Sequence, residues 1–512
     1  MKRNLLFLSC LACCITLMAQ RNKKTPNILI ILSDDHAYQA ISAYGGSLMQ
    51  TPNIDRIAKE GAIFLNACVT NSLCAPSRAA WLTGKYSHVN WLKVNNITNP
   101  FNINQELFPR MLKTRDYQTG WIGKWHLQTL PGNAFDYWKI LPDQGQYYNP
   151  DFIDMKNDTV RIKGYVTDII TSLSFDWLNQ RDTSKPFCLI IGEKATHRAW
   201  LPDLQDLGAF DNVRFPLPPN FYDDYKDRMA AKNQDMTIAK TMLLGDDLKV
   251  HADYSGNDFY NRLNPEQLSV FKSYYEKLSK EFDRDHYRGR ALTEWKYQRY
   301  LKDYLSTAKS LDRNVGKILD WLDKNGLTEN TVVIYASDQG FYMGEHGWFD
   351  KRFMYEESLK TPVVMRYPGV VKPGTKVNQM IMNIDFAPSL LTIAGLTVPA
   401  SMQGSSFLPL LQPGDTKNWR HAAYYHYYEY PEPHHVSPHF GIRTEQYKLI
   451  RFYGPADTWE LYDLKKDPGE MKNLYREKKE SGLVKSLKKQ LDALIIQYHD
   501  DEAKRILEKE SN

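Results

Sequence analysis

The stretch 27-NILIILSDDH-36 decides the fold class. It is an apolar run in which polar residues do not alternate, and it ends in a pair of aspartates. The stretches 117-YQTGWIGKWH-126, 187-FCLIIGEKATH-197 and 331-TVVIYASDQG-340 have the same form. Strands that are apolar on both faces belong to mostly parallel sheets that helices cover on both sides. We therefore expect these stretches to be buried strands of one such sheet.

Helical patterns lie between and after these strands. Residues 51–64 begin with Thr-Pro and carry apolar residues at helical spacing, and residues 293–326 form a long amphipathic pattern ended by Asn-Gly. The sequence therefore predicts an α/β fold with a large mixed, mostly parallel sheet sandwiched by helices. Ligands of such sheets bind at the carboxyl ends of the strands, which is where the polar clusters lie.

Changes in composition along the sequence predict two structural units after an N-terminal signal segment. Residues 20–400 form the larger, catalytic unit, and a charged and aromatic stretch from about 200 to 290 is an insertion within it. The stretches 422–430, 440–453 and 459–468 are typical of antiparallel strands, and a charged helix follows from about 471 to 509. Residues 401–512 are thus expected to form a smaller C-terminal α+β subdomain with an antiparallel sheet.

The first 19 residues predict export. A basic MKRN segment precedes the apolar LLFLSCLACCITL, and Ala19 is a small residue before a cleavage point. This is the pattern of a secretory signal peptide, too short for a membrane span, and no later stretch has 18 consecutive apolar residues. We expect a periplasmic protein without a stable membrane span. Simple cleavage is favoured over lipoprotein anchoring, because Cys10, Cys13 and Cys14 do not follow a lipid-anchor pattern.

The charge and the cysteine content of the chain exclude some classes of function. The net charge is only +5 in 512 residues and no Lys/Arg block is dense, so nucleic acid is not an expected partner. After removal of the signal peptide, Cys68, Cys74 and Cys188 remain. Their spacing resembles neither a zinc site nor a disulfide framework.

Oxygen ligands follow two of the predicted strands. Asp34 and Asp35 end the first strand, and Asp338 and Gln339 end the last one. Carboxylate and amide oxygens suit Ca²⁺ or Mg²⁺ better than zinc or copper. Each pair alone is better explained as the end of a strand and the cap of the following helix. The two pairs together favour a metal site.

Cationic side chains converge on the same edge. Any one of them, taken alone, is typical of a surface lysine or a buried, hydrogen-bonded histidine. As a set beside a metal they indicate a pocket for a compact anion with several oxygens, such as a sulfate or phosphate ester. The set is Arg78, Lys124, His126, His197 and Lys351.

Cys74 lies in 71-NSLCAPSRAAWLTG-84. Pro76 suits the first turn of a helix, so the pattern predicts a helix that begins near Cys74 and ends near Gly84. Free amides and the helix dipole favour negative charge at a helix N-terminus. The position is therefore suitable for a nucleophile.

The stretch CAPSRAAWLTG resembles the signature of the type I sulfatases of the alkaline phosphatase superfamily. In that family the cysteine is oxidised to Cα-formylglycine (3-oxoalanine) by a sulfatase-maturating enzyme. The motifs SDDH, GKWH, ATHR, SDQG, GEHGWFDKR and the tail GIRTEQYKLI…WELYDLKKDP follow in the family's order along nearly the whole mature chain. The resemblance implies an alkaline-phosphatase-like fold and makes Cys74 the modified residue.

The resemblance also implies residue roles. One Ca²⁺ ion per chain would be bound by Asp34, Asp35, Asp338, Gln339 and an oxygen of the modified Cys74. Gln339 departs from the Asn or His common in the family, and its longer side chain leaves its ligand role open. The sulfate and the modified residue would be held by Arg78, Lys124, His126, His197 and Lys351.

The family mechanism follows from these parts. A hydroxyl of the hydrated aldehyde attacks sulfur in line, and the metal and cations stabilise the developing charge. An acid, His197 or Lys351, protonates the leaving oxygen. The second hydroxyl then releases sulfate and regenerates the aldehyde.

Residues 337–369 and the C-terminal tail more closely resemble bacterial glycosaminoglycan N-acetylglucosamine-6-O-sulfatases. This implies an exo-acting enzyme that removes the 6-O-sulfate of N-acetylglucosamine or glucosamine from heparan sulfate or heparin-type oligosaccharides. Because the C-terminal subdomain borders the pocket in this family, the expected sugar contacts are Glu429, His434, His435, His439 and Arg443.

Other functions fit the same residues. The sulfate could be at another glycan position, such as 2-O on a uronic acid or 6-O on N-acetylgalactosamine. A phosphate or phosphonate monoester hydrolase could use the same fold. A non-catalytic protein that binds sulfated glycans would keep Cys74 as an unmodified thiol.

Overall fold

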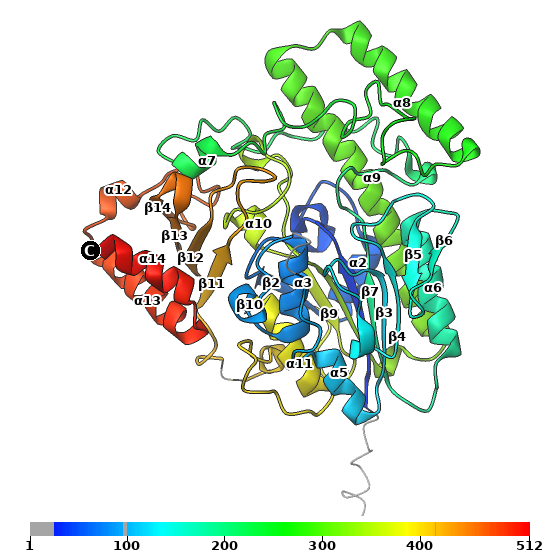
Figure 1. Cartoon of the computed structure of the whole chain (residues 1–512), viewed down its shortest axis with the longest axis horizontal. Helices are drawn as coiled ribbons and strands as arrows, with labels where there is room; N and C mark the ends of the chain where they lie inside the picture. Colours follow the sequence, from blue (N-terminus) through cyan, green and yellow to red (C-terminus); the bar gives the residue numbers. More distant parts are fainter. Residues whose placement is uncertain (1–24, 96–99, 415, 512) are drawn as a thin grey trace, which may run out of the picture.

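The computed structural model describes residues 25–95, 100–414 and 416–511. The predicted signal peptide lies outside the described residues. The described chain forms a large mixed sheet of ten strands and a separate antiparallel sheet of four strands (Figure 1). None of its helices is both long and apolar enough to cross a membrane.

The four predicted strands form the centre of the large sheet. They are neighbours in the order β8, β1, β7, β3, and each pairs with the next in parallel. Their side chains are almost all buried, which explains why polar residues do not alternate in the sequence. The strands are β1 (Asn27–Ser33), β3 (Gln118–Lys124), β7 (Phe187–Gly192) and β8 (Thr331–Ser337).

Shorter strands extend the sheet on both sides and make it mixed. On the β8 side the order continues with β9, β2 and β10, and β9 is antiparallel to both of its neighbours. On the β3 side β4 pairs in parallel, and the next two strands are antiparallel. These strands are β2 (Ala62–Cys68), β4 (Tyr137–Leu141), β5 (Asp151–Asp154), β6 (Thr159–Arg161), β9 (Val363–Arg366) and β10 (Thr375–Met382).

Helices cover both faces of the sheet, as the sequence predicts (Figure 1). One layer contains α2 (Pro52–Lys59), α6 (Val166–Gln180) and α9 (Gly289–Lys324), and the other contains α3 (Cys74–Thr83), α5 (Phe108–Leu112) and α11 (Phe386–Ile393). The short helices α4 (Ser87–Asn90) and α10 (Glu356–Leu359) lie in connections.

The expectation of helix throughout residues 51–64 is wrong after Lys59. The chain leaves α2 at Glu60, and Ala62 already begins β2. A Cβ atom at Gly61 would lie 2.0 Å from the carbonyl oxygen of Met365 in β9. Glycine therefore allows the backbone to pass close to β9 and change from helix to strand.

The segment from about 200 to 290 is largely irregular. It contains α7 (Met229–Asn233) and α8 (Pro265–Asp285), and Asn264 and Gln267 form a capping box at the start of α8. Helix α8 and the first half of α9 extend together at the top of Figure 1.

The C-terminal residues form the four-stranded sheet and cover it with helices. The strands are β11 (Ala422–Tyr427), β12 (His439–Thr444), β13 (Tyr447–Phe452) and β14 (Thr458–Asp463), and the helices are α12 (Tyr475–Lys478), α13 (Gly482–Tyr498) and α14 (Asp501–Ser511). The predicted strand 440–453 is a hairpin of two strands. The predicted helix 471–509 is three helices, since Ser481 caps α13 and His499 ends it in the left-handed conformation.

Candidate active site

The carboxyl ends of the central strands bring the predicted site residues together. Ser33 of β1 is opposite Ser337 of β8, so Asp34 and Asp338 each follow at the same level. The backbone amide of Asp338 donates a hydrogen bond to the carbonyl of Ser33 at 3.1 Å. The parallel register thus places two acidic residues, 304 positions apart in the chain, at one point.

Three carboxylates meet at this point. Asp34, Asp35 and Asp338 are fully buried, and each offers an oxygen within 4.8 Å of the other two. Tyr304 on α9 donates to the backbone carbonyl of Asp35 at 2.6 Å and helps to fix this turn. Burial and the neighbouring carboxylates raise the pKa of Asp35 to about 6 and that of Asp338 to about 7.

Each carboxylate has its own cationic partner. The pairs are Lys124 with Asp34, Lys351 with Asp35 at 2.7 Å and Arg78 with Asp338 at 2.9 Å. Burial alone would raise the pKa of Asp34, but Lys124 beside it holds that pKa well below its usual range. These cations and carboxylates thus lie in one buried cluster.

Cys74 is the first residue of α3, as the sequence predicts. Its Sγ atom lies 3.4 Å from Oδ1 of Asp34 and 3.5 Å from Nε2 of Gln339. Burial and the charge of Asp34 raise the pKa of the thiol above its ordinary value. An unmodified Cys74 would therefore be a protonated thiol, which is a weak nucleophile.

The residues around Cys74 fit a hard divalent cation. Nε2 of Gln339 donates to Asp35 at 2.6 Å, and its Oε1 is buried and has no hydrogen-bond partner in the described part of the chain. Three carboxylates and this amide oxygen form the all-oxygen ligand set that calcium prefers. Within the described ranges no disulfide competes for the thiol, because Cys68, Cys74 and Cys188 are all free.

Both predicted histidines belong to the cluster. Nδ1 of His197 is 2.8 Å from the carbonyl oxygen of Arg198, and a ring nitrogen of His197 lies within 4.8 Å of Asp34 and Cys74. His126 follows β3 and is almost completely buried. Burial lowers the pKa of His126 to about 4 and that of His197 well below its ordinary value.

Several residues of the cluster were not expected. Oε1 of Gln144 accepts a hydrogen bond from Lys124 at 2.5 Å, and its carbonyl oxygen accepts one from Lys194 at 3.1 Å. Gln144 follows β4, a strand that the sequence pattern does not predict. Asp350 and Arg352 flank Lys351 and form ion pairs there. Their position next to Lys351 in the motif FDKR is the sequence feature that could have identified them.

Glu429 and His434 lie beside these flanking residues. Oε2 of Glu429 is 2.5 Å from Arg352, and Nε2 of His434 is 3.0 Å from Asp350. His435 is about half exposed and lies 3.4 Å from Asp235. The structure thus connects Glu429 and His434 to the strand-end cluster through the residues next to Lys351.

His439 and Arg443 are placed differently. Nε2 of His439 accepts from the backbone amide of Met354 at 3.0 Å, and its Nδ1 is 2.9 Å from the carbonyl of Ser437. Arg443 is buried against Glu356 at 3.0 Å. Met354 and Glu356 precede β9, so these contacts pack the C-terminal sheet against the larger unit, and the structure does not bring either residue to the strand-end cluster.

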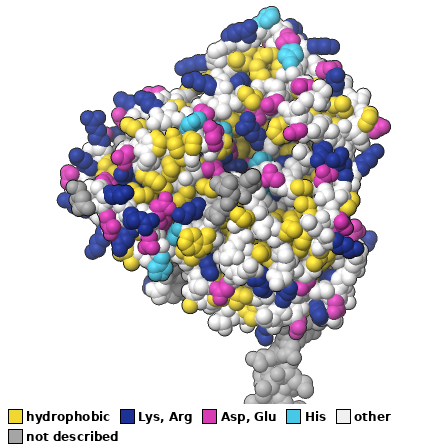
Figure 2. Space-filling view, in the orientation of Figure 1, with side chains coloured by type: hydrophobic (Ala, Val, Ile, Leu, Met, Phe, Trp, Pro, Cys, Tyr) yellow, Lys and Arg dark blue, Asp and Glu magenta, His cyan; other side chains and the backbone are white. Residues whose placement is uncertain are grey.

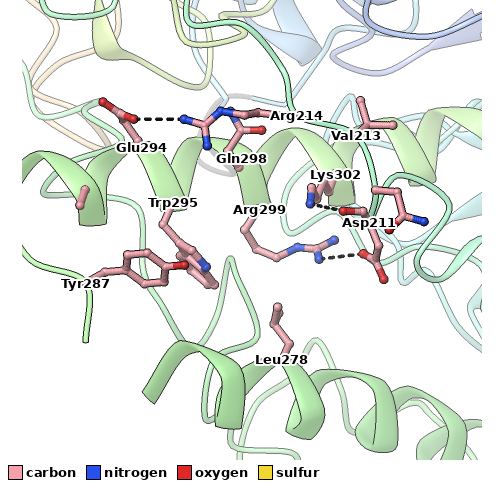
Figure 3. Close-up of a pocket in the computed structure, with 12 residues that line it drawn as sticks. Asp211, Val213, Arg214, Leu278, Tyr287, Glu294, Trp295, Gln298, Arg299 and Lys302 are labelled. Atoms are coloured by element: carbon pink, nitrogen blue, oxygen red, sulfur yellow. Dashed lines mark hydrogen bonds and ion pairs between the residues drawn. The ribbon is translucent and has the colours of Figure 1, made fainter. Parts of the chain in front are cut away.

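A separate cavity of about 480 Å³ lies between α8 and α9. Figure 3 shows Trp295 and Arg299 on α9 and Leu278 on α8 lining it, and it contains none of the predicted site residues. On the face drawn in Figure 2, lysines and arginines are interspersed with acidic side chains.

Comparison with known proteins identifies families and proteins to which this chain is similar. The sulfatase family model matches residues 26–396, and a model described as the C-terminal part of N-sulphoglucosamine sulphohydrolase matches residues 344–497. An N-acetylglucosamine-6-O-sulfatase of Bacteroides thetaiotaomicron is 45% identical over 96% of this chain and 90% of its own length. The N-acetylglucosamine-6-sulfatase of Capra hircus is 28% identical over 78% of this chain and 66% of its own.

A solved structure agrees with this relationship. It is a complex described as containing the enzyme's substrate, D-glucosamine-2-N,6-O-disulfate, and it is 45% identical to this chain with a TM-score of 0.90. The match covers 93% of this chain and 99% of the other.

Proposed function

The chain belongs to the sulfatase family, and from this premise we propose that it is an exo-acting enzyme for glucosamine-type 6-O-sulfates. It hydrolyses the 6-O-sulfate ester of N-acetylglucosamine or glucosamine in oligosaccharides of the heparan sulfate and heparin type. The observation that carries the activity is the position of Cys74 at the start of α3, within 3.4 Å of Asp34. The substrate assignment is supported by the 45% identical relative, which is an N-acetylglucosamine-6-O-sulfatase.

Two groups complete the proposed site. Ca²⁺ would be held by Asp34, Asp35, Asp338 and Gln339, where it would offset the repulsion of the carboxylates and polarise a sulfate oxygen. Cys74, oxidised to formylglycine by a sulfatase-maturating enzyme, would supply a hydroxyl nucleophile in its hydrated form. The buried, protonated thiol supports this role, because it would be a poor nucleophile without modification.

The cations of the cluster bind and orient the ester. Nη2 of Arg78 and Nδ1 of His126 are buried and have no hydrogen-bond partner among the described residues. Lys124 and Lys351 add two positive charges next to Asp34 and Asp35. Such preorganised donors stabilise the charge that develops on sulfate oxygens in the transition state.

His197 is proposed to protonate the leaving sugar oxygen. Its Nδ1 faces the carbonyl of Arg198, which leaves Nε2 for this role. In the substrate-free protein burial and Lys124 keep the pKa of His197 low. A bound sulfate ester brings negative charge that favours the imidazolium form.

The C-terminal unit is proposed to contact the sugar. Glu429 and His434 are the best placed of the expected residues, because they contact Arg352 and Asp350 beside Lys351. His435 is a secondary candidate near the same segment. We also propose that residues 1–19 are a signal peptide and that the mature enzyme acts in the periplasm.

Sulfate release from a panel of monosaccharides and disaccharides tests this function. Sugars carrying sulfate at the 2-, 3-, 4-, 6- or N-position are compared on one purified, matured sample. The proposal predicts turnover of 6-O-sulfated N-acetylglucosamine and glucosamine. Turnover confined to 2-O-sulfated uronic acids would contradict the substrate, faster release from a phosphate ester would contradict the sulfatase reaction, and binding without turnover would contradict an enzyme.

A further inference from the structure

The turn after β4 connects three cationic or imidazole side chains through one residue, Gln144. Leu141 of β4 is opposite Lys124 of β3, so the turn that follows lies at the same edge of the sheet. The amide of Gly145 donates to the carbonyl of Pro142 at 2.8 Å and closes this turn. Gln144 therefore lies beside the residues that follow β3.

The orientation of the Gln144 amide follows from its contact with Lys124. Nζ of Lys124 can only donate, and it lies 2.5 Å from Oε1 of Gln144. The amide oxygen must face Lys124, and the NH₂ group must face the other way. Nε2 of Gln144 is then 2.9 Å from Nε2 of His126.

This orientation determines the tautomer of His126. Because the amide NH₂ donates, Nε2 of His126 must accept, and the proton of the neutral ring must be on Nδ1. Nδ1 is buried and without a partner in the described ranges. A buried N–H without a partner is costly, so it is suited to an oxygen that arrives with the substrate.

Other charged groups also face the His126 ring. Lys124 ends β3, two residues before His126, Asp34 follows β1, and Asp143 lies in the same turn as Gln144. Oδ1 of Asp143 is 3.3 Å from Nε2 of His126, but its side chain is 67% exposed and is accessible to water. The shorter contact with the oriented amide therefore sets the proton position.

We propose that Gln144 is a positioning residue of the sulfatase site, which holds His126 with its proton on Nδ1 and keeps Nζ of Lys124 in place. The proposal deepens the proposed function and rests on it. Lys194 is anchored to the same residue, since its Nζ donates to the Gln144 carbonyl at 3.1 Å. One glutamine thus contacts Lys124, His126 and Lys194.

Gln144→Glu tests the proposal. A carboxylate still accepts from Lys124, but it also accepts from His126, so the neutral ring moves its proton to Nε2 and turns a lone pair toward the ester. The expected result is a kcat/KM that falls with rising pH through the neutral range and is about 10- to 100-fold below wild type at the alkaline end. Wild-type enzyme keeps the Nδ1 proton on His126, so it should show only the pH dependence of the general acid His197 and lack this additional loss.

Gln146→Glu is the matched control. It adds the same charge two residues away, and Gln146 forms no hydrogen bond in the described chain. It should keep the wild-type pH profile. Asp143→Asn should keep it too, whereas an altered profile in that variant would assign the His126 proton to Asp143 and overturn the proposal.

Nitrogen NMR of wild-type enzyme labelled with ¹⁵N-histidine reads the tautomer in the unaltered site, and a variant is needed only for the assignment. His126 is assigned by the resonances that disappear in His126→Gln. A neutral ring protonated on Nδ1 supports the proposal, and protonation on Nε2 overturns it, as do identical pH profiles for Gln144→Glu and Gln146→Glu. Absence of sulfate release from every substrate would contradict the proposed function instead and leaves the tautomer measurement intact.

Discussion

Sγ of Cys74 lies 3.4 Å from Oδ1 of Asp34, and both residues are fully buried. A thiolate at this position would be desolvated and next to a negative charge, so burial and Asp34 raise the pKa of the thiol. Thiolate catalysis is therefore disfavoured at the centre of the cluster. The same position suits a neutral hydroxyl nucleophile beside a cation, which is what oxidation of Cys74 would provide.

Cys74→Ala should lower sulfate release by more than about a thousandfold, because it removes the nucleophile and leaves only binding and charge stabilisation. The assay is sulfate release from 6-O-sulfated N-acetylglucosamine, with circular dichroism to confirm folding. Cys68→Ala is the matched control, since Cys68 is also a buried free cysteine but lies in β2. Equal activity of the two variants would show that Cys74 is not the nucleophile.

Calcium should raise the melting temperature of the folded protein and a chelator should lower it, because the ion binds only the assembled carboxylates. The expected stabilisation is about 2.7 kcal/mol at a free calcium concentration of about 100 times Kd. Differential scanning fluorimetry measures it. Asp35→Asn should weaken the response, whereas Asp312→Asn, which alters a buried carboxylate bonded to the backbone of α2, should keep it. A melting temperature indifferent to calcium would contradict the metal site.

His197→Ala should slow sugar sulfates much more than activated aryl sulfates. A sugar alkoxide needs a proton as it leaves, whereas a nitrophenolate does not, and general acid catalysis contributes about 10²- to 10⁴-fold. The measurement is the ratio of kcat/KM for the two substrate types in wild type and variant. Equal losses on both would remove His197 from the acid role and leave Lys351 as the candidate.

Glu193→Gln should stabilise the protein increasingly as the pH rises. Glu193 is fully buried after β7, its carboxyl oxygens have no partner among the described residues, and burial raises its pKa well above the ordinary value. The folded state keeps a proton that the unfolded state loses above about pH 4.3, so this group costs stability as the pH increases toward its folded pKa.

Urea unfolding at about pH 5 and about pH 8 measures this effect. The variant should gain little at the lower pH and clearly more at the higher pH. The same difference between variant and wild type at both pH values would show that Glu193 does not carry the predicted proton.

The centre of the fold could be predicted from the sequence because its strands are buried on both faces. Continuous apolar runs such as 27–33 and 331–337 have no other good explanation in a chain of this length. The flanking strands were not predicted, since β6 is exposed along its whole length and β10 mixes buried and exposed residues. Their pairing depends on tertiary neighbours that a local pattern does not encode.

The residues of the candidate site, like the strands of the fold, could be predicted in part from the sequence. Residues at the ends of the predicted strands, such as Asp34 and Lys124, meet as expected because parallel strands share one edge. Gln144 could not be found, because its position depends on β4. His439 looked like a sugar contact in a histidine-rich stretch, but it begins β12 and packs between Phe353 and Phe452. A local motif does not reveal which face of a strand a side chain occupies.

The mature enzyme is proposed not to use Cys74 as a thiol. Mass spectrometry of the peptide containing Cys74, from protein matured in a host with the modifying enzyme, tests it most directly. The expected peptide has the mass that corresponds to replacement of the thiol and one hydrogen by an aldehyde oxygen, and its fraction rises in proportion to the specific activity of the sample. A fully active sample with only the unmodified cysteine peptide would contradict it.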